Sequence, residues 1–215
     1  MNGRAARCAA GAGAALVLLA SGCGSGAATH PTTSPGPVLG ATQVTYHGRR
    51  VQGGAVATDF ALRDQRGRMV QLSALRGRIV VLTFLYTHCV DVCPLIAGNV
   101  DRAVRSLAPR SRDVVVLAVS VDPDHDTPGA VRRFVAEHRL SRSFHYLTGP
   151  LDELRPIWQA YNLLIEPGSA GRVAHSAYIL VLNRSGRPRI YYPPLATEPV
   201  LAHDLAAMVH GKGRV

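Results

Sequence analysis

The chain is poor in cysteine, lysine and aromatic residues. Only four of its 215 residues are cysteines, and Lys212 is its single lysine, so arginine carries almost all of the formal net charge of +10. The basic residues are scattered rather than gathered in a run, and aromatic residues make up 6% of the chain. A nucleic-acid-binding protein would be expected to show a basic stripe or a motif of stacking aromatics, so we do not expect nucleic acid as a partner.

The first 23 residues have the layout of a secretory signal. Two arginines precede an apolar stretch, 9–20, which is shorter than the roughly 20 residues of a comfortable membrane span. Small residues directly before Cys23 resemble the lipobox of bacterial lipoproteins, although Ala20 stands where the lipobox more often has leucine. We therefore expect residues 1–22 to be a removed signal peptide and Cys23 to be a lipid anchor on the extracytoplasmic face of the cell membrane. The alternatives are an ordinary cleaved signal and an uncleaved anchor.

A polar, flexible segment follows this start. Residues 24 to about 40 are rich in Gly, Ser, Thr, Pro and Ala, and such a composition buries too little apolar surface to become ordered. We expect a tether over 23–45 and a single folded domain over 46–212, because the remaining length suits one hydrophobic core.

Apolar patterning in the domain alternates between strand and helix periods. Three continuous apolar runs predict buried central strands at 79–86, 114–121 and 176–182. Four segments with helical period predict helices at 94–107, 128–138, 152–161 and 200–209. Two short strands around Gly67, at 59–64 and 69–72, predict a hairpin. This order indicates an α/β sandwich with parallel strands joined by crossovers.

Two local signals refine the helices. Thr127 before Pro128 is a capping residue ahead of a proline at the first helical position, which is a standard helix start. Pro156 interrupts the third helical segment, so we expect a kink or two short pieces there.

Only two cysteines remain in the folded part, because Cys8 lies in the signal and Cys23 at its boundary. One close pair in an exported protein, Cys89 and Cys93, is expected to be a redox pair, a metal pair, or both in turn. The pair lies between strand 79–86 and a helix start, where the helix N-terminus stabilises thiolates. If the first helical turn includes residues 90–94, the spacing of four places both sulfurs on one face.

Two thiolates are soft donors that favour copper(I) or zinc. Structural zinc requires four protein ligands, and the domain has no third cysteine, whereas copper(I) accepts three ligands. His175 directly precedes the apolar run 176–182, in a loop that lies beside the cysteines of a thioredoxin-like sheet. The alternative is that its ring only ends a loop in solvent. We expect His88 to point away from Cys89, and four further histidines to lie on the surface: His47, His138, His203 and His210.

The motifs TFLYTHCVDVCP, SVDPDHDTP and VAHSAYILVLNRSG, with Asp59, Phe60, Leu62 and Gly67, resemble the Sco/SenC family of thioredoxin-like copper chaperones for cytochrome c oxidase. The resemblance runs from about 57 to 209. It implies a thioredoxin-like three-layer sandwich with a central mixed sheet and an N-terminal β-hairpin. It also implies a copper ion, Cu(I) or Cu(II), bound by Cys89, Cys93 and His175.

The chain departs from the family pattern at two positions. Val90 stands where proline is frequent, and Ala174 stands where an acidic residue often precedes the histidine. The second departure removes a candidate partner for the His175 ring, which a backbone carbonyl, Asp91 or Asp122 could replace. For Asp122, Asp124 and Asp126 themselves, turns and helix caps are the expected role, with a place beside the metal as the alternative.

Three functions follow from these residues. The first is a copper carrier without turnover, which passes copper to the dinuclear copper site of cytochrome c oxidase subunit II or to another copper protein. The second is a thiol–disulfide oxidoreductase in which Cys89 attacks and Cys93 resolves, so that the acceptor's cysteines stay reduced. The third, a peroxidase using Cys89, is weaker because the chain lacks a convincing peroxidatic motif. Copper binding requires His175, whereas thiol exchange needs only the cysteine pair.

Overall fold

The computed structural model describes residues 45–167 and 173–211. The predicted signal peptide, the Cys23 anchor and nearly all of the predicted tether therefore lie outside the described residues. Among the helices that are described, none is both long enough and apolar enough to span a membrane.

The main sheet of the domain has eight strands in the order β1-β10-β9-β4-β5-β6-β2-β3. Strands β4, β5 and β6 pair in parallel, and the remaining neighbours pair antiparallel, so the sheet is mixed as expected. The strands are β1 (Arg49–Arg50), β2 (Ala61–Asp64), β3 (Met69–Gln71), β4 (Ile79–Leu85), β5 (Val114–Ser120), β6 (Phe144–Thr148), β9 (Ile179–Leu182) and β10 (Pro188–Tyr192).

Strands β4 and β5 form the centre of the sheet because every residue in both is buried. Their parallel register runs from Ile79 opposite Val114 to Leu85 opposite Ser120. Both strands therefore end at the same edge of the sheet, and the loops that follow them lie side by side. Ligand sites in sheets of this kind form at the carboxyl ends of the strands.

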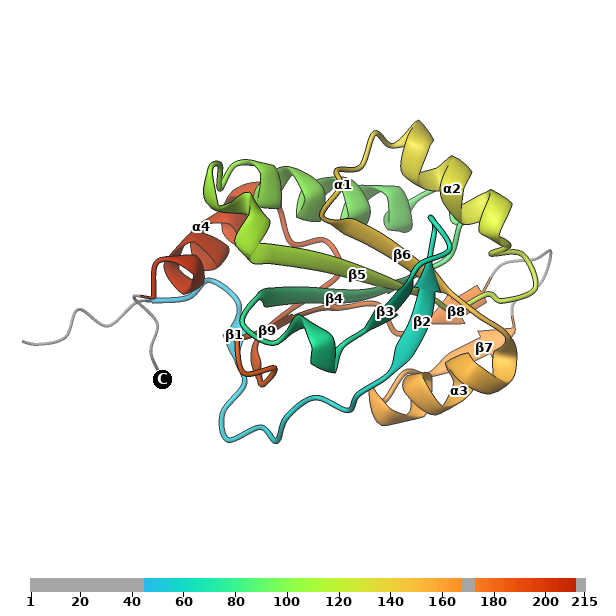
Figure 1. Ribbon diagram of the computed structural model, residues 1–215, viewed down its shortest axis with the longest axis horizontal. Helices are drawn as coiled ribbons and strands as arrows, with labels where there is room; N and C mark the ends of the chain where they lie inside the picture. Colours follow the sequence, from blue (N-terminus) through green and yellow to red (C-terminus); the bar gives the residue numbers. More distant parts are fainter. Residues whose placement is uncertain (1–44, 168–172, 212–215) are drawn as a thin grey trace, which may run out of the picture. The chain divides into compact units, whose positions relative to one another are not determined.

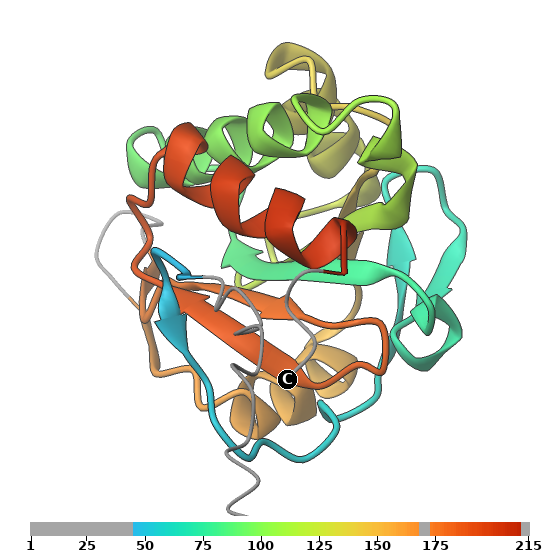
Figure 2. The ribbon, with the colours of Figure 1, turned by 90° about the vertical axis from the view of Figure 1, so that its left-hand side faces the viewer.

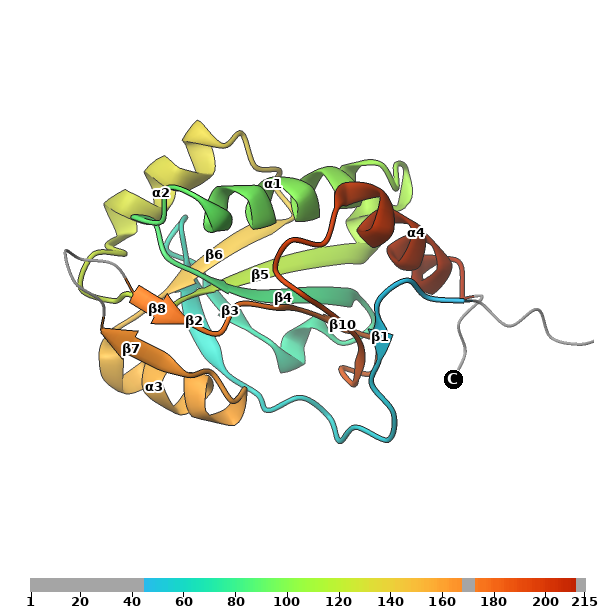
Figure 3. The ribbon, with the colours of Figure 1, turned by 180° about the vertical axis from the view of Figure 1, so that it is seen from behind.

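Helices cover both faces of the sheet. Figures 1 and 3 show α1 (Val92–Arg105), α2 (Pro128–Glu137) and α4 (Glu198–Val209) on one face and α3 (Leu151–Ala160) on the other. Figure 2 shows α1 and α4 lying side by side over the sheet, and these two helices are in contact. Two short 3₁₀ helices, η1 (Ser73–Leu75) and η2 (Arg110–Asp113), complete the helical elements of the described chain. The expected three-layer arrangement is confirmed.

A second, two-stranded sheet carries His175. Strands β7 (Ile165–Pro167) and β8 (Val173–His175) pair antiparallel, with Ile165 opposite His175, and this ribbon is not hydrogen-bonded into the main sheet. The predicted strand 176–182 is therefore too long. Pairing with β4 covers only Ile179–Leu182. Before it, the Ser176 N–H donates to the Leu164 carbonyl at 3.0 Å.

Several local predictions are confirmed and one is wrong. The hairpin is present as β2 and β3, and all four helices lie within two residues of their predicted starts. The Thr127 hydroxyl caps α2 by accepting from the Ala130 N–H at 3.2 Å. Helix α3, however, continues through Pro156 as one element, so the expectation of two short pieces is wrong. Pro156 is on the exposed face, where water can satisfy the carbonyl that loses its N–H partner.

The carboxylate of Asp204 joins α4 to the residues before β1 and to β10. It is fully buried and accepts hydrogen bonds from the backbone N–H groups of His47 and Gly48, each at 2.9 Å, and from the Tyr192 hydroxyl at 2.7 Å. Burial opposes ionisation of Asp204, but the surrounding donors outweigh it and lower its pKa. A carboxyl with a lowered pKa stabilises the fold above its unfolded pKa of about 4, and that stability is lost as pH falls through the folded pKa.

We expect Asp204→Asn to lower the free energy of unfolding at pH 7 by about 2 to 3 kcal/mol, because an amide nitrogen would then face N–H donors. Urea unfolding followed by circular dichroism measures this difference, which should shrink below about pH 4. Glu137→Gln, at an exposed carboxylate, is the matched control and should change stability by less than about 0.5 kcal/mol. Equal stability of Asp204→Asn and the wild type at pH 7 would show that Asp204 is not a structural anchor.

Candidate metal centre

The buried side chain of Asp126 anchors the loop between β4 and α1 through hydrogen bonds to Thr87. One carboxylate oxygen accepts from the Thr87 N–H at 2.8 Å and from the Thr87 hydroxyl at 2.6 Å. The other accepts from the hydroxyls of Ser120 at 2.6 Å and Tyr146 at 3.1 Å. Burial raises the pKa of Asp126, and these four hydrogen bonds offset part of that effect. Asp126 thus joins the ends of β4 and β5 to β6.

Cys89 and Cys93 lie together at the end of this loop. The Cys93 N–H donates to the Cys89 sulfur at 3.3 Å, and both thiols are free in the structure. The expected reason for their proximity is wrong, because α1 begins at Val92 and Cys89 lies before the helix. The cysteines approach one another because the Cys89 sulfur accepts from the helix N-terminus, where the first N–H groups have no partner inside the helix.

The two sulfurs differ sharply in acidity. Burial opposes ionisation of Cys89, but hydrogen bonds from the Cys93 thiol and from N–H groups at the start of α1 outweigh it and lower the pKa of Cys89. Burial raises the pKa of Cys93 far above that of a free thiol. Cys89 is therefore the more acidic, partly exposed thiol of the pair, and Cys93 is the less acidic, buried one.

The His175 ring is oriented by a backbone carbonyl. Its Nδ1 lies 3.2 Å from the Ser176 carbonyl oxygen, which fixes the proton on Nδ1 and leaves the Nε2 lone pair for a ligand. Burial lowers the pKa of His175, so its ring is neutral at neutral pH, as metal binding requires. The carbonyl supplies the support that the chain lacks at Ala174.

Tyr86 lies between the cysteines and His175. Its ring is edge-on to the His175 ring, with 5.8 Å between the ring centroids, and its hydroxyl hydrogen-bonds to the Cys89 sulfur and to the Val173 backbone. In this conformation the ligand atoms of Cys89, Cys93 and His175 do not all lie within 4.8 Å of one another. The structure thus brings the two cysteines together but does not bring His175 within the same distance of both sulfurs.

The four histidines that the sequence predicted to lie on the surface are there. His47, His138, His203 and His210 are all exposed. His88 is also exposed and faces the His125 ring, with 4.9 Å between their centroids. It follows β4 rather than ending it, because β4 stops at Leu85.

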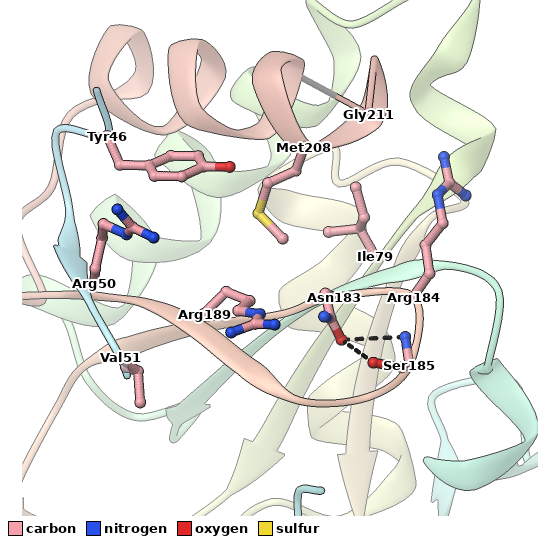
Figure 4. Close-up of a pocket in the computed structure, with 10 residues that line it drawn as sticks. All are labelled: Tyr46, Arg50, Val51, Ile79, Asn183, Arg184, Ser185, Arg189, Met208 and Gly211. Atoms are coloured by element: carbon pink, nitrogen blue, oxygen red, sulfur yellow. Dashed lines mark hydrogen bonds between the residues drawn. The ribbon is translucent and has the colours of Figure 1, made fainter. Parts of the chain in front are cut away.

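A separate cavity lies at the other end of β4. Its volume is about 290 Å³ and it is lined by arginines together with Tyr46 and Met208, as Figure 4 shows. Ile79, the first residue of β4, also lines it, whereas the cysteines follow the last residue of that strand. The cavity is therefore not part of the candidate metal centre.

Sequence reasoning missed the roles of Tyr86 and Asp126. Tyr86 closes the apolar run that predicted β4, so it was counted only as a strand residue. For Asp126 the sequence predicts a turn or cap, with a place beside the metal as the alternative, although a carboxylate directly before a capped helix and after a buried strand can also turn inward. No pattern in the sequence distinguishes these two orientations.

Comparison with known proteins agrees with this arrangement. The family model described as SCO1/SenC matches residues 49–210. The chain belongs to the SCO1/SenC family. The mitochondrial SCO2 homolog of Bos taurus is 32% identical over 145 residues, which are 62% of this chain and 52% of that protein. The chain thus spans about half the length of the curated relatives that it matches.

Solved structures of Sco proteins share the thioredoxin-like fold. The structure of Bradyrhizobium japonicum ScoI with copper bound has a TM-score of 0.64 and 27% identity, covering 72% of this chain and 99% of that one. The structure of BsSco, a member of the Sco family of cytochrome c oxidase assembly proteins, has a TM-score of 0.63 over 76% of this chain and 96% of that one. At 22% identity, BsSco shows the fold alone.

The acidity difference predicts how the two cysteines react. We expect iodoacetamide to modify Cys89 well before Cys93, with a pH–rate midpoint below the pKa of about 8.5 of a free thiol. Cys93→Ala should move that midpoint upward, because it removes a donor to the Cys89 sulfur. Peptide mapping by mass spectrometry measures both rates. Faster labelling of Cys93 would contradict the assigned roles.

Proposed function

We propose that this chain binds one copper ion through Cys89, Cys93 and His175 and carries it to a copper protein of the respiratory chain. The observation that supports this most strongly is the paired cysteines at the carboxyl end of β4, in a chain of the SCO1/SenC family. The copper-bound ScoI structure shows that this fold holds copper in a relative.

The donor set fits copper. Two sulfurs and one neutral imidazole are soft or borderline ligands, and three-coordinate copper(I) needs no fourth protein ligand. Four-coordinate structural zinc would need a further donor at this position. The depressed pKa of Cys89 favours the thiolate that a metal requires, while the high pKa of Cys93 means that copper must displace a proton there.

Copper binding requires His175 to approach the sulfurs. The β7–β8 ribbon makes no strand pairing with the main sheet, so it can shift without breaking the central ladder. The contacts to be replaced are those of Tyr86, whose hydroxyl bonds both Cys89 and the Val173 backbone. We infer that Tyr86 separates His175 from the cysteines in the copper-free state.

Apolar side chains around the cysteines support delivery to a protein acceptor. Val90 is 86% exposed and Leu95 is 56% exposed on either side of Cys93, and Leu164 is 75% exposed beside the ribbon of His175. Exposed apolar groups around a metal centre suit a surface that docks on another protein. The acceptor we propose is the dinuclear copper site of cytochrome c oxidase subunit II.

A membrane-anchored location would bring the carrier to that acceptor. We propose that Cys23 is acylated and holds the domain at the extracytoplasmic face of the membrane. The segment between Cys23 and the domain would connect the two. The oxidising compartment outside the cytoplasm is also where a dithiol must alternate between metal binding and disulfide formation.

His175→Ala should abolish stoichiometric copper binding, because two sulfurs alone would leave the ion one ligand short. Anaerobic titration with absorption spectroscopy measures this through the thiolate-to-copper(II) charge-transfer band. His210→Ala, at an exposed histidine after α4, is the control and should bind one equivalent. Full copper affinity in His175→Ala would contradict the three-ligand site. If the chain catalyses thiol exchange but binds no copper, the oxidoreductase function is favoured instead.

Val90→Gln should slow copper transfer to an apo acceptor domain roughly fivefold without changing copper affinity, since burying a polar side chain forfeits about 1 kcal/mol of apolar contact. Stopped-flow spectroscopy of the charge-transfer band follows the transfer. Met69→Gln, at a 55% exposed residue of β3 on the far edge of the sheet, is the control. Equal transfer rates for both variants would show that Val90 does not contact the acceptor.

A further inference from the structure

The loops after β4 and β5 bring together a second group of metal-binding side chains that contains no sulfur. We propose that His88, Asp122 and His125 form a site for one divalent cation, copper(II) or zinc, separate from the cysteine pair. Their ligand atoms all lie within 4.8 Å of one another. The proposal does not depend on the copper-carrier function, because none of its ligands belongs to that site.

The central strands create this juxtaposition. Parallel pairing aligns the ends of β4 and β5, and the Val121 N–H donates to the Leu85 carbonyl at 3.0 Å just beyond them. His88 therefore reaches across from one loop to His125 in the other. Their rings are edge to face, 4.9 Å apart between centroids, and both rings are exposed, so each can rotate toward a shared ion.

Asp122 supplies a carboxylate that is largely withdrawn from water. Its side chain is 7% exposed, and both oxygens lie 2.9 Å from Nδ1 of His125. Within the described residues, His125 is the only group with a hydrogen bond to this carboxylate that the structure shows. A nearly buried carboxylate with a single exposed imidazole as its partner leaves lone pairs available for a cation.

The chemistry of the three donors selects the ion. Two imidazole nitrogens and one carboxylate oxygen are borderline ligands, which suit copper(II) and zinc better than magnesium or calcium. With metal–ligand bonds of about 2.0 Å, neighbouring ligands of a tetrahedral site lie roughly 3.3 Å apart. The 2.9 Å between Asp122 and His125 is close to that spacing, so an ion can replace the shared proton with a small adjustment.

The domain contains a similar cluster that serves as an internal control. His47, His203 and Asp204 also bring their ligand atoms within 4.8 Å of one another. Asp204, however, already accepts from the His47 and Gly48 backbone and from the Tyr192 hydroxyl. A cation there would have to break the bonds that join α4 to the sheet, so we expect no binding at that cluster.

The experiment uses the full chain with both Cys89→Ser and Cys93→Ser, so that the thiolate site is absent. Copper(II) is titrated against a competing chelator, and electron paramagnetic resonance reports the ligands. One equivalent should bind with hyperfine splitting from imidazole nitrogen. His88→Ala and His125→Ala, made in this background, should each weaken binding at least tenfold, and His203→Ala should leave it unchanged. Zinc titrated by calorimetry should follow the same order.

Two outcomes would overturn the site. The first is binding of equal affinity in the background chain and in its His125→Ala variant. The second is loss of binding in His203→Ala, which would assign the ion to the other cluster. Because His88 and His125 are exposed, their variants are expected to fold, and circular dichroism with thermal unfolding verifies this before each titration.

Discussion

The candidate metal centre depends on one buried carboxylate, that of Asp126. It is 1% exposed and accepts four hydrogen bonds, from the Thr87 N–H and the hydroxyls of Thr87, Ser120 and Tyr146. Removing a carboxylate from water is costly, and these four donors offset part of that cost. The geometry of the cysteine loop follows, because Thr87 precedes the cysteines by two residues and is held at both its N–H and its hydroxyl.

The start of α1 gives the two sulfurs different burial and different acidity. Cys89 lies outside the helix and receives N–H donors from it, whereas Cys93 lies inside the helix and is buried against the core. Spacing alone would have made the two thiols equivalent. The local structure instead makes Cys89 a partly exposed, more acidic ligand and Cys93 a buried one whose proton a metal must displace.

The sequence predicted the parts of the fold in which a single pattern dominates. The runs of β4 and β5 were found because nearly all of their residues are apolar, and the four helices were found because their apolar residues recur with helical period. Strand β6 was missed because His145 and Thr148 interrupt it, although His145 pairs with Asp64 and Thr148 with the backbone of Asp126. Strand β10 begins at a proline, and β1 has only two residues, so neither has a periodic signal.

In the metal centre, too, the sequence predicted only what a local pattern or the family resemblance could indicate. The proximity of Cys89 and Cys93 could be predicted because their chain separation is short, and the family resemblance pointed to His175. The place of Tyr86 between them, and the facing of His88 and His125, depend on the pairing of strands and ribbons far apart in the chain. Such contacts have no local pattern, and they decide which conformation the copper-free protein adopts.

The most direct test of the metal centre is X-ray absorption spectroscopy of the copper-loaded chain. The account predicts two sulfur scatterers and one imidazole nitrogen around the ion. A copper shell that contains no sulfur, or one that contains two sulfurs and no imidazole nitrogen, would contradict it.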